Sequence, residues 1–215
     1  LRDEHPDCDV IVMDDGLQNP ALAKRLTISV VDGTRGFGNG YVIPAGPLRA
    51  PLDAQLKRTG AIVVNRGHDA TAPCAIAEHL RATFSGPVIE ATVAPAGATD
   101  WLAGTRVLAY AGIGAPDRFF TLLERLGATL ADTRRFADHH AFTSQDARSL
   151  LRDAQALGAT LITTEKDHVR LAKTDAALAE LATATRTLPI ELVLQPPDAE
   201  RLRSLLAAAL SPKPA

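Results

Sequence analysis

Two adjacent aspartates, Asp14 and Asp15, directly follow a short apolar run. Carboxylates at the end of a buried parallel strand can hold Mg²⁺, directly or through water, and the metal then bridges nucleotide phosphates. Gly16 lets the backbone turn away from such a metal, and Gln18 can add a contact to the nucleotide or to a metal-bound water. The motif DDGLQ therefore predicts a nucleotide and metal site, with an ordinary Asp-Gly turn as the alternative.

A glycine-rich segment, GTRGFGNGYVIPAGPLR, occupies residues 33–49. It is neither a Walker loop nor a GxGxxG motif, but backbone N–H groups freed by glycine can line an anion site. Arg35 and Arg49 carry planar forks suited to phosphate, and Asn39 is a further polar candidate for contact with a substrate. The apolar side chains of the same segment are Phe37, Tyr41, Val42 and Ile43. The segment suits a substrate with a phosphorylated head and apolar tails; the alternative is a surface loop with solvated arginines.

A third cluster, Asp138-His139-His140, lies in the run FADHHAFT ahead of a predicted helix, for which Thr143 or Ser144 can supply the N-cap. A carboxylate can fix the tautomer of a neighbouring imidazole, so these residue types suit acid–base catalysis. One alternative is a solvated loop. Another is the Asp-His-His motif of a metal-dependent phosphoesterase family, which needs several further aspartates upstream that this sequence does not supply.

Two smaller polar motifs follow predicted strands. GIGAP at residues 112–116 opens a predicted helix, and its terminus can face nucleotide or form a tight strand-to-helix turn. TEKD at residues 164–167 either orients a nucleotide at a strand end or starts a salt-bridged helix.

Short β-branched runs alternate with helical segments, which predicts an α/β fold with parallel strands buried on both faces. The predicted strands are Asp9–Met13, Leu26–Asp32, Ala61–Asn65, Val88–Val93, Arg106–Tyr110, Thr129–Arg134, Thr160–Thr163 and Ile190–Leu194. The predicted helices are Cys74–Thr83, Pro116–Leu126, Ser144–Leu157 and Asp198–Leu210.

The turn-forming run Ser85-Gly86-Pro87 predicts a domain boundary. We expect residues 1–86, with the C-terminal helix (197–215) packed on them, to form one domain, and residues 87–196 to form a smaller α/β domain. The strands Val88–Val93 and Ile190–Leu194 are expected to pair with each other.

Composition limits the classes of function. Of 215 residues, 46% are hydrophobic and 22% charged, and the net charge of −2 offers no basic field for nucleic acid. Two distant cysteines predict no disulfide framework, and Cys8 is expected in the core. No apolar run reaches the roughly 20 residues of a membrane helix.

Five motifs, in order, give the chain a family resemblance. DDGLQ, VVDGTRGFGNGYVIPAGPLR, AYAGIGAPDRFF, FADHHAFT and TTEKD closely resemble the successive motifs of the lipid A 4′-kinase (tetraacyldisaccharide 4′-kinase) family, over its C-terminal two-thirds. The resemblance implies a partial P-loop-kinase-like parallel sheet domain plus the second, smaller α/β domain. It also implies transfer of the γ-phosphate of ATP, with Mg²⁺, to the 4′-hydroxyl of a tetraacylated glucosamine disaccharide 1-phosphate.

The resemblance also assigns roles to residues. Asp14 and Asp15 take the place of the Walker B acidic pair, with Gln18 beside the nucleotide. Arg49 matches an active-site arginine, and His139 matches a histidine that pairs with an upstream aspartate to activate the 4′-hydroxyl.

At two positions the sequence departs from the family pattern. Ala50 stands where the family usually has Glu, and Asn19 stands where it usually has His.

The sequence contains no GxxxxGK[ST] run, which a P-loop kinase needs to hold the β- and γ-phosphates. The chain begins with Leu1, and we expect the phosphate loop, a membrane helix and the partner aspartate to lie upstream of it in a longer parent enzyme. These 215 residues alone are then expected to show no turnover. The alternative is a non-catalytic remnant or lipid-binding scaffold. The lipid substrate implies a peripheral location at the cytoplasmic face of the bacterial inner membrane; no protein partner can be inferred.

Overall fold

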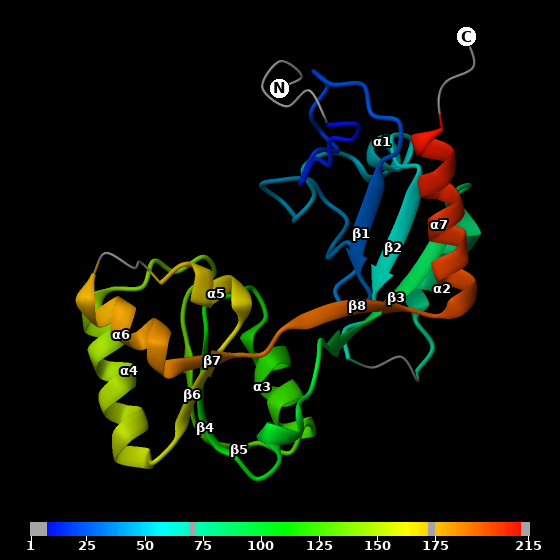
Figure 1. Cartoon of the computed structure of the whole chain (residues 1–215). Helices are drawn as coiled ribbons and strands as arrows, with labels where there is room; N and C mark the ends of the chain where they lie inside the picture. Colours follow the sequence, from blue (N-terminus) through cyan, green and yellow to red (C-terminus); the bar gives the residue numbers. More distant parts are fainter. Residues whose placement is uncertain (1–7, 69–71, 172–174, 212–215) are drawn as a thin grey trace. The chain divides into compact units, whose positions relative to one another are not determined.

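A computed structural model describes residues 8–68, 72–171 and 175–211. It confirms the α/β class: mostly parallel strands form two separate four-stranded sheets. Contacts divide the chain into two compact units, one containing the residues up to Val93 together with those from Leu192 onward, the other Ala94–Glu191. The sequence places its boundary near Ser85–Pro87. The two units, each with its own sheet, are described separately here (Figure 1).

The first unit is built on a sheet with the strand order β1-β2-β3-β8. β1 pairs with β2, and β2 with β3, in parallel. The position of β8 beside β3 agrees with the expected pairing of these two segments. The elements are β1 (Ile28–Asp32), α1 (Leu52–Leu56), β2 (Ala61–Asn65), α2 (Ala75–Thr83), β3 (Val88–Pro95), β8 (Ile190–Leu194) and α7 (Pro196–Leu210).

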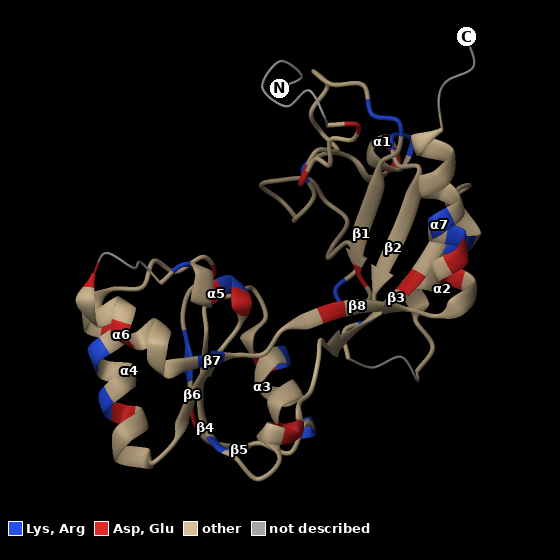
Figure 2. Ribbon diagram, in the orientation of Figure 1, with Lys and Arg blue, Asp and Glu red and all other residues tan. Residues whose placement is uncertain are grey.

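Helices cover both faces of this sheet, which explains why β2 is apolar at successive positions rather than alternating ones. On one face Ile62 and Val64 pack with Ala77 and Leu80 of α2. On the other face Val63 packs with residues of β3 and with two leucines of α7, Leu202 and Leu205. Charged residues occupy other positions of α7 (Figure 2), including the ion pairs Arg201–Asp198 and Arg203–Glu200.

The second unit has the strand order β5-β4-β6-β7, and every pair in it is parallel. Its elements are a 3₁₀ turn (Asp100–Leu102), β4 (Arg106–Ala111), α3 (Pro116–Arg125), β5 (Thr129–Arg135), α4 (Ser144–Leu157), β6 (Thr160–Thr163), α5 (Glu165–Val169), α6 (Ala176–Ala184) and β7 (Thr185–Thr187). Alternate residues of β4 face opposite layers: Val107 and Ala109 pack against α3, whereas Leu108 and Tyr110 pack against α4 and α6.

One predicted strand is wrong. Residues 9–13 form no strand, and Val10, Ile11 and Val12 are exposed by 47%, 60% and 90%. A parallel strand is stable only when neighbouring strands supply its hydrogen bonds, and β1 pairs with β2 on one side while forming the edge of its sheet. Cys8, expected in the core, is exposed for the same reason.

The elements that were not predicted are α1, α6, β7 and the 3₁₀ turn (Asp100–Leu102). α5 begins at the TEKD motif, for which a helix start was one of the two predictions. None of the helices in the described residues is long and apolar enough to span a bilayer.

Tyr110 gives a test of the second unit's core. Its hydroxyl is buried and lies 3.0 Å from Thr185 Oγ1, and burial raises the pKa of Tyr110 above its ordinary value. The folded unit therefore favours the protonated tyrosine. The stability that this provides is complete below the unfolded pKa of about 10 and falls as the pH rises above it.

We predict that Tyr110→Phe loses about 1 kcal/mol of unfolding free energy at pH 7, because a buried hydrogen bond is removed. Above about pH 10 the difference from the parent chain should shrink, since only the parent must bury an ionising phenol. Urea unfolding at both pH values measures this. The exposed Tyr41, as Tyr41→Phe, is the control and should follow the parent at every pH. A constant difference across the pH range would contradict the prediction.

Candidate functional site

The glycine-rich segment of the first unit begins where β1 and β2 end, the edge at which open α/β sheets bind ligands. Asp32 is the last residue of β1, and its Oδ1 accepts hydrogen bonds from the backbone N–H groups of Thr34 (2.8 Å) and Arg35 (2.9 Å). The N–H of Gly33 donates to the carbonyl of Asn65, the last residue of β2, at 2.8 Å. These bonds fix the start of the glycine loop, residues 33–49, on two strand ends.

The glycine loop and the acidic turn, residues 14–18, are joined by an ion pair. Arg49 Nη1 lies 2.6 Å from Asp15 Oδ2, and both side chains are more than half exposed. Asp15 has a φ of 53°, in the left-handed region that few non-glycine residues adopt. The structure thus brings together two predicted site residues that are far apart in sequence, and it holds one of them in a strained backbone conformation.

Gln18 makes a second link between the acidic turn and the end of the glycine loop. Its Nε2 donates to Gln55 Oε1 at 3.0 Å, and Gln55 Nε2 donates to the carbonyl of Ala50 at 2.7 Å. Gln18 Oε1 is buried and, within the described part of the chain, has no hydrogen-bond partner. An unsatisfied buried acceptor is costly, so this atom needs a donor that the described residues do not supply.

Asn39 shapes the glycine loop from within. Its Nδ2 donates to the carbonyl of Ala45 at 2.8 Å, and its Oδ1 accepts from the N–H of Tyr41 at 3.2 Å. A Cβ at Gly46 would overlap Asn39 Oδ1 and the carbonyl of Tyr41, so only glycine fits there. Asn39 therefore sets the loop's shape, while the side chain of Arg35 is exposed.

The acidic turn meets the needs of a nucleotide-bound magnesium ion. Mg²⁺ in such sites takes one or two carboxylates from the protein and its other ligands from phosphate and water. Asp14 and Asp15 supply that number, and Gln18 Oε1 can accept from a metal-bound water. The described residues do not form a metal site from protein ligands alone, because they contain no group of three or more His, Cys, Asp or Glu side chains that could hold an ion.

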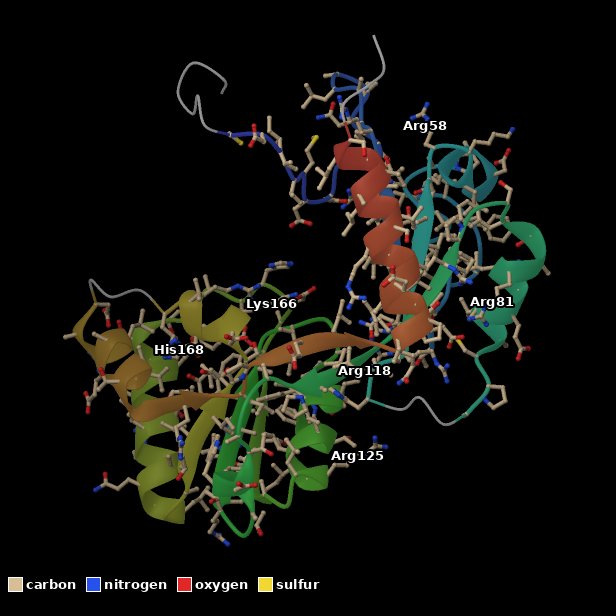
Figure 3. All side chains as sticks on the ribbon, turned by 45° about the vertical axis from the view of Figure 1, so that its right-hand side comes forward. Arg58, Arg81, Arg118, Arg125, Lys166 and His168 are labelled. Carbon is tan, nitrogen blue, oxygen red and sulfur yellow. The ribbon has the colours of Figure 1, made fainter. Side chains whose placement is uncertain are left out.

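In the second unit, three motifs converge at the carboxyl ends of β4, β5 and β6. Asp167, the third residue of α5 and fully buried, accepts from the N–H of Gly112 (3.1 Å) and from Thr164 Oγ1 (2.7 Å). Thr164 is the N-cap of that helix. A Cβ at Gly112 would meet Asp167 Oδ1 and the carbonyl of Ala137 at 3.2 Å. The neighbours of Asp167 on α5, Lys166 and His168, are labelled in Figure 3.

His139 is held at this edge by its backbone and its ring. Its φ is 60°, and its N–H donates to the carbonyl of Gly112 at 3.1 Å. Its side chain is 80% exposed, with Nε2 3.9 Å from Asp138 Oδ1 and Nδ1 3.0 Å from Arg170 Nη2. The predicted catalytic pair Asp138 and His139 thus lies at the strand ends with an open imidazole.

His140 is in a different environment from its neighbour. Its ring stacks on Phe136 with centroids 4.8 Å apart, and its Nε2 lies 3.0 Å from Asp146 Oδ2. Burial raises the pKa of Asp146, but the hydrogen bonds from His140 and from Thr143 outweigh it and hold that pKa below its usual value. Thr143 is the N-cap of α4, with Asp146 in a reciprocal capping box. His140 therefore stabilises the fold, and His139 is the histidine available for chemistry.

Arg170 is a site residue that the sequence analysis missed. Its spacing from Asp167 is the i,i+3 spacing of helical ion pairs, so the pair itself was recognisable. The contact with His139 joins residues from separate loops, and no local pattern encodes it.

Parallel sheets that carry polar motifs at the carboxyl ends of their strands define a ligand-binding α/β protein. Comparison with known proteins identifies the family. The model of the family described as "Tetraacyldisaccharide-1-P 4'-kinase" matches residues 1–211. The chain therefore belongs to the tetraacyldisaccharide-1-phosphate 4′-kinase family, as its motifs predicted.

Curated relatives carry the same name. The tetraacyldisaccharide 4'-kinase of Methylobacterium sp. (strain 4-46) is 46% identical over 94% of this chain and 58% of its own length. That of Rhodopseudomonas palustris (strain HaA2) is 47% identical over 92% of this chain and 56% of its own length. That of Methylobacterium nodulans is 46% identical over 97% and 58%. The chain thus spans somewhat more than half the length of these relatives.

Substitution of Gly112 tests how closely the three motifs pack against one another. Its Cβ position is crowded by Asp167 Oδ1, Ala137 O and His140 Cβ, all at 3.2–3.3 Å. We predict that Gly112→Ala lowers the unfolding free energy of the second unit by about 1–3 kcal/mol, because an overpacked site must shift its neighbours. Urea unfolding measures the change.

Gly114→Ala is the matched control, since its Cβ would meet the carboxylate of Asp138 at an ordinary 3.4 Å. Equal stability of the two variants would show that the strand end at Gly112 tolerates a side chain.

Asp146 gives a pH-dependent prediction. Because its pKa is lowered in the folded state, it stabilises the fold above the unfolded value of about 3.9 and loses this effect as the pH falls through the folded value. Asp146→Ala should cost about 1–2 kcal/mol at pH 7 through the lost cap, and less as the pH falls below about 4. Unfolding curves from pH 7 to pH 3 measure it. A cost that stayed constant over this range would argue against a charged cap.

Proposed function

We propose that this chain forms the acceptor-side and Walker B part of a kinase that transfers the γ-phosphate of ATP to the 4′-hydroxyl of a tetraacylated glucosamine disaccharide 1-phosphate, in lipid A biosynthesis. The observation that carries the proposal is His139: an exposed imidazole, in a strained backbone conformation, at the strand ends where three family motifs meet. Strained residues of this kind cluster at active sites. Family membership supplies the reaction class.

The residues of the first unit serve the nucleotide and the phosphorylated lipid head. Asp14 and Asp15 are the residues that would hold Mg²⁺, and Gln18 Oε1 is the nearby acceptor of the same turn. When bound, the ion would supply positive charge to the phosphates of ATP. Arg35 and Arg49 bind anionic oxygens, and Asn39 maintains the loop that presents them.

The ion pair between Asp15 and Arg49 has a role in this scheme. A cation at Asp15 competes with the guanidinium for the carboxylate, and a phosphate competes with the carboxylate for the guanidinium. Binding of metal and phosphate would therefore replace one exposed ion pair, Asp15–Arg49, by two others: Asp15 with the metal and Arg49 with the phosphate. An exposed pair is weak, about 0–1 kcal/mol, so the exchange costs little.

His139 and Asp138 act on the acceptor. The imidazole touches the 4′-hydroxyl, and phosphoryl transfer then depends on positioning and charge stabilisation.

The lipid substrate places the enzyme at the cytoplasmic face of the bacterial inner membrane as a peripheral protein. Tyr41 and Ile43 of the glycine loop are exposed by 65% and 62%, which suits contact with acyl chains. No nucleic-acid or protein partner is proposed. The 215 residues alone are expected to be inactive, because their sequence has no Walker A loop.

The test is a phosphorylation assay of the full-length protein with radiolabelled ATP and the tetraacyldisaccharide 1-phosphate. We predict that His139→Ala lowers kcat by about 100-fold or more, the effect of removing a positioned hydrogen-bond donor from the reacting centre, and leaves the KM for ATP nearly unchanged.

The control is His79→Ala, which removes an exposed histidine of α2 and should behave as the parent. Unchanged turnover of His139→Ala would remove this residue from the mechanism. Absence of phosphorylation by the full-length parent, with lipid binding retained, would favour a lipid-binding scaffold instead.

A further inference from the structure

Arg170 connects a buried carboxylate to the exposed imidazole. Its Nη1 donates to Asp167 Oδ1 and to the carbonyl of Gly112, both at 3.1 Å, while its Nη2 lies 3.0 Å from His139 Nδ1. The arginine side chain is 25% exposed and Asp167 is fully buried. One guanidinium thus spans a helix, a strand end and the histidine loop, residues 136–143.

Because arginine can only donate hydrogen bonds, its contact determines which nitrogen of the His139 ring carries the proton. A guanidinium has only N–H donors and keeps its charge in proteins. Nδ1 of His139 can therefore make this contact only as an acceptor, through its lone pair. In a neutral imidazole one nitrogen accepts and the other carries the proton, so the proton must be on Nε2.

The surroundings of Nε2 agree with this assignment. Asp138 Oδ1 lies 3.9 Å from His139 Nε2, which is too far for a hydrogen bond. A carboxylate on this side of the ring still favours a proton on Nε2. Asp138, which the sequence suggested as the group that fixes the tautomer, lies farther from the ring than Arg170 does. The hydrogen bond that orients the ring comes from Arg170.

We propose that Arg170 is a positioning residue for the kinase reaction: held by Asp167, it fixes His139 in the tautomer that carries its proton on Nε2. The inference about the catalytic consequence rests on the proposed function; the tautomer itself does not. His139 then presents a hydrogen-bond donor, Nε2–H, to an oxygen of the substrate or of a carboxylate.

The first test measures the tautomer. Long-range proton–nitrogen correlation spectra of the isotope-labelled chain distinguish the two neutral tautomers, and the loss of one set of peaks in His139→Gln assigns those of His139. We expect His139 to show the Nε2–H pattern in the parent chain. Arg170→Lys should convert this to a mixture, because the compact ammonium cannot pair with Asp167 and reach the imidazole in the same fork geometry.

Arg170→Lys is preferred to a neutral variant because it leaves a cation near the buried Asp167, which limits the loss of stability. Arg152→Lys is the matched control, since Arg152 is an exposed arginine of α4 that lies 4.0 Å from Asp153. Thermal unfolding of both variants shows whether the fold is retained. If Arg170→Lys does not fold, the tautomer of His139 in the parent chain decides the inference by itself.

The second test is a double-mutant cycle in the full-length enzyme. Arg170→Lys should lower kcat by about 10- to 100-fold with little change in either KM, the size of effect expected from misplacing a catalytic group. In a His139→Ala background the same substitution should have no further effect on kcat, because its action passes through the missing ring.

The outcomes separate this inference from the proposed function. An Nδ1–H pattern for His139 in the parent, or equal effects of Arg170→Lys with and without His139, would overturn the inference while leaving the kinase proposal intact. Full activity of His139→Ala would overturn the catalytic role of His139, and with it the catalytic consequence, while the spectra would still decide the tautomer.

Discussion

Asp167 is fully buried, and a buried carboxylate is stable only when hydrogen bonds and a cation replace the water it has lost. Its partners come from three elements: the N–H of Gly112 after β4, the hydroxyl of Thr164 after β6, and Arg170 at the end of α5. Because Asp167 requires all of these partners, the ends of β4 and β6 are held close to α5. The histidine loop is then attached to the same strand end, through the carbonyl of Gly112.

The two units share one kind of sheet topology but carry different chemical groups in their loops. Each has a mostly parallel sheet covered on both faces, so each exposes its strand ends and the loops that follow them. In the first unit the loop after β1 carries arginines and is joined to a carboxylate of the acidic turn, residue types that suit phosphate and Mg²⁺. In the second they carry imidazole and a buried carboxylate, the groups that position and move protons. The separation explains why the family motifs are spread along most of the chain.

Much of the fold could be predicted because the main elements are encoded locally. β2, α4, β6 and β8 begin and end where the sequence pattern places them. The strand expected at residues 9–13 fails because a strand needs partners that its own residues do not specify. β7 has three residues and owes its conformation to pairing with β6. The unpredicted α6 did carry a signal, since Asp175 caps it by accepting from Leu178 N–H. In the site, residue types and motifs were predictable, but the Arg170–His139 contact was not, because it depends on the shared burial of Asp167.

The same contact explains why two adjacent histidines have different roles. His140 packs on Phe136 and hydrogen-bonds to Asp146 of the capping box, so its ring is used by the fold. A chain in ordinary extended or helical conformation would leave His139 without a fixed position, because 80% of its side chain is exposed. The left-handed backbone at His139 directs its N–H to the carbonyl of Gly112, and Arg170 donates to that same carbonyl and to the ring. The backbone strain is thus offset by bonds that also orient the imidazole, so an exposed side chain acquires a fixed geometry.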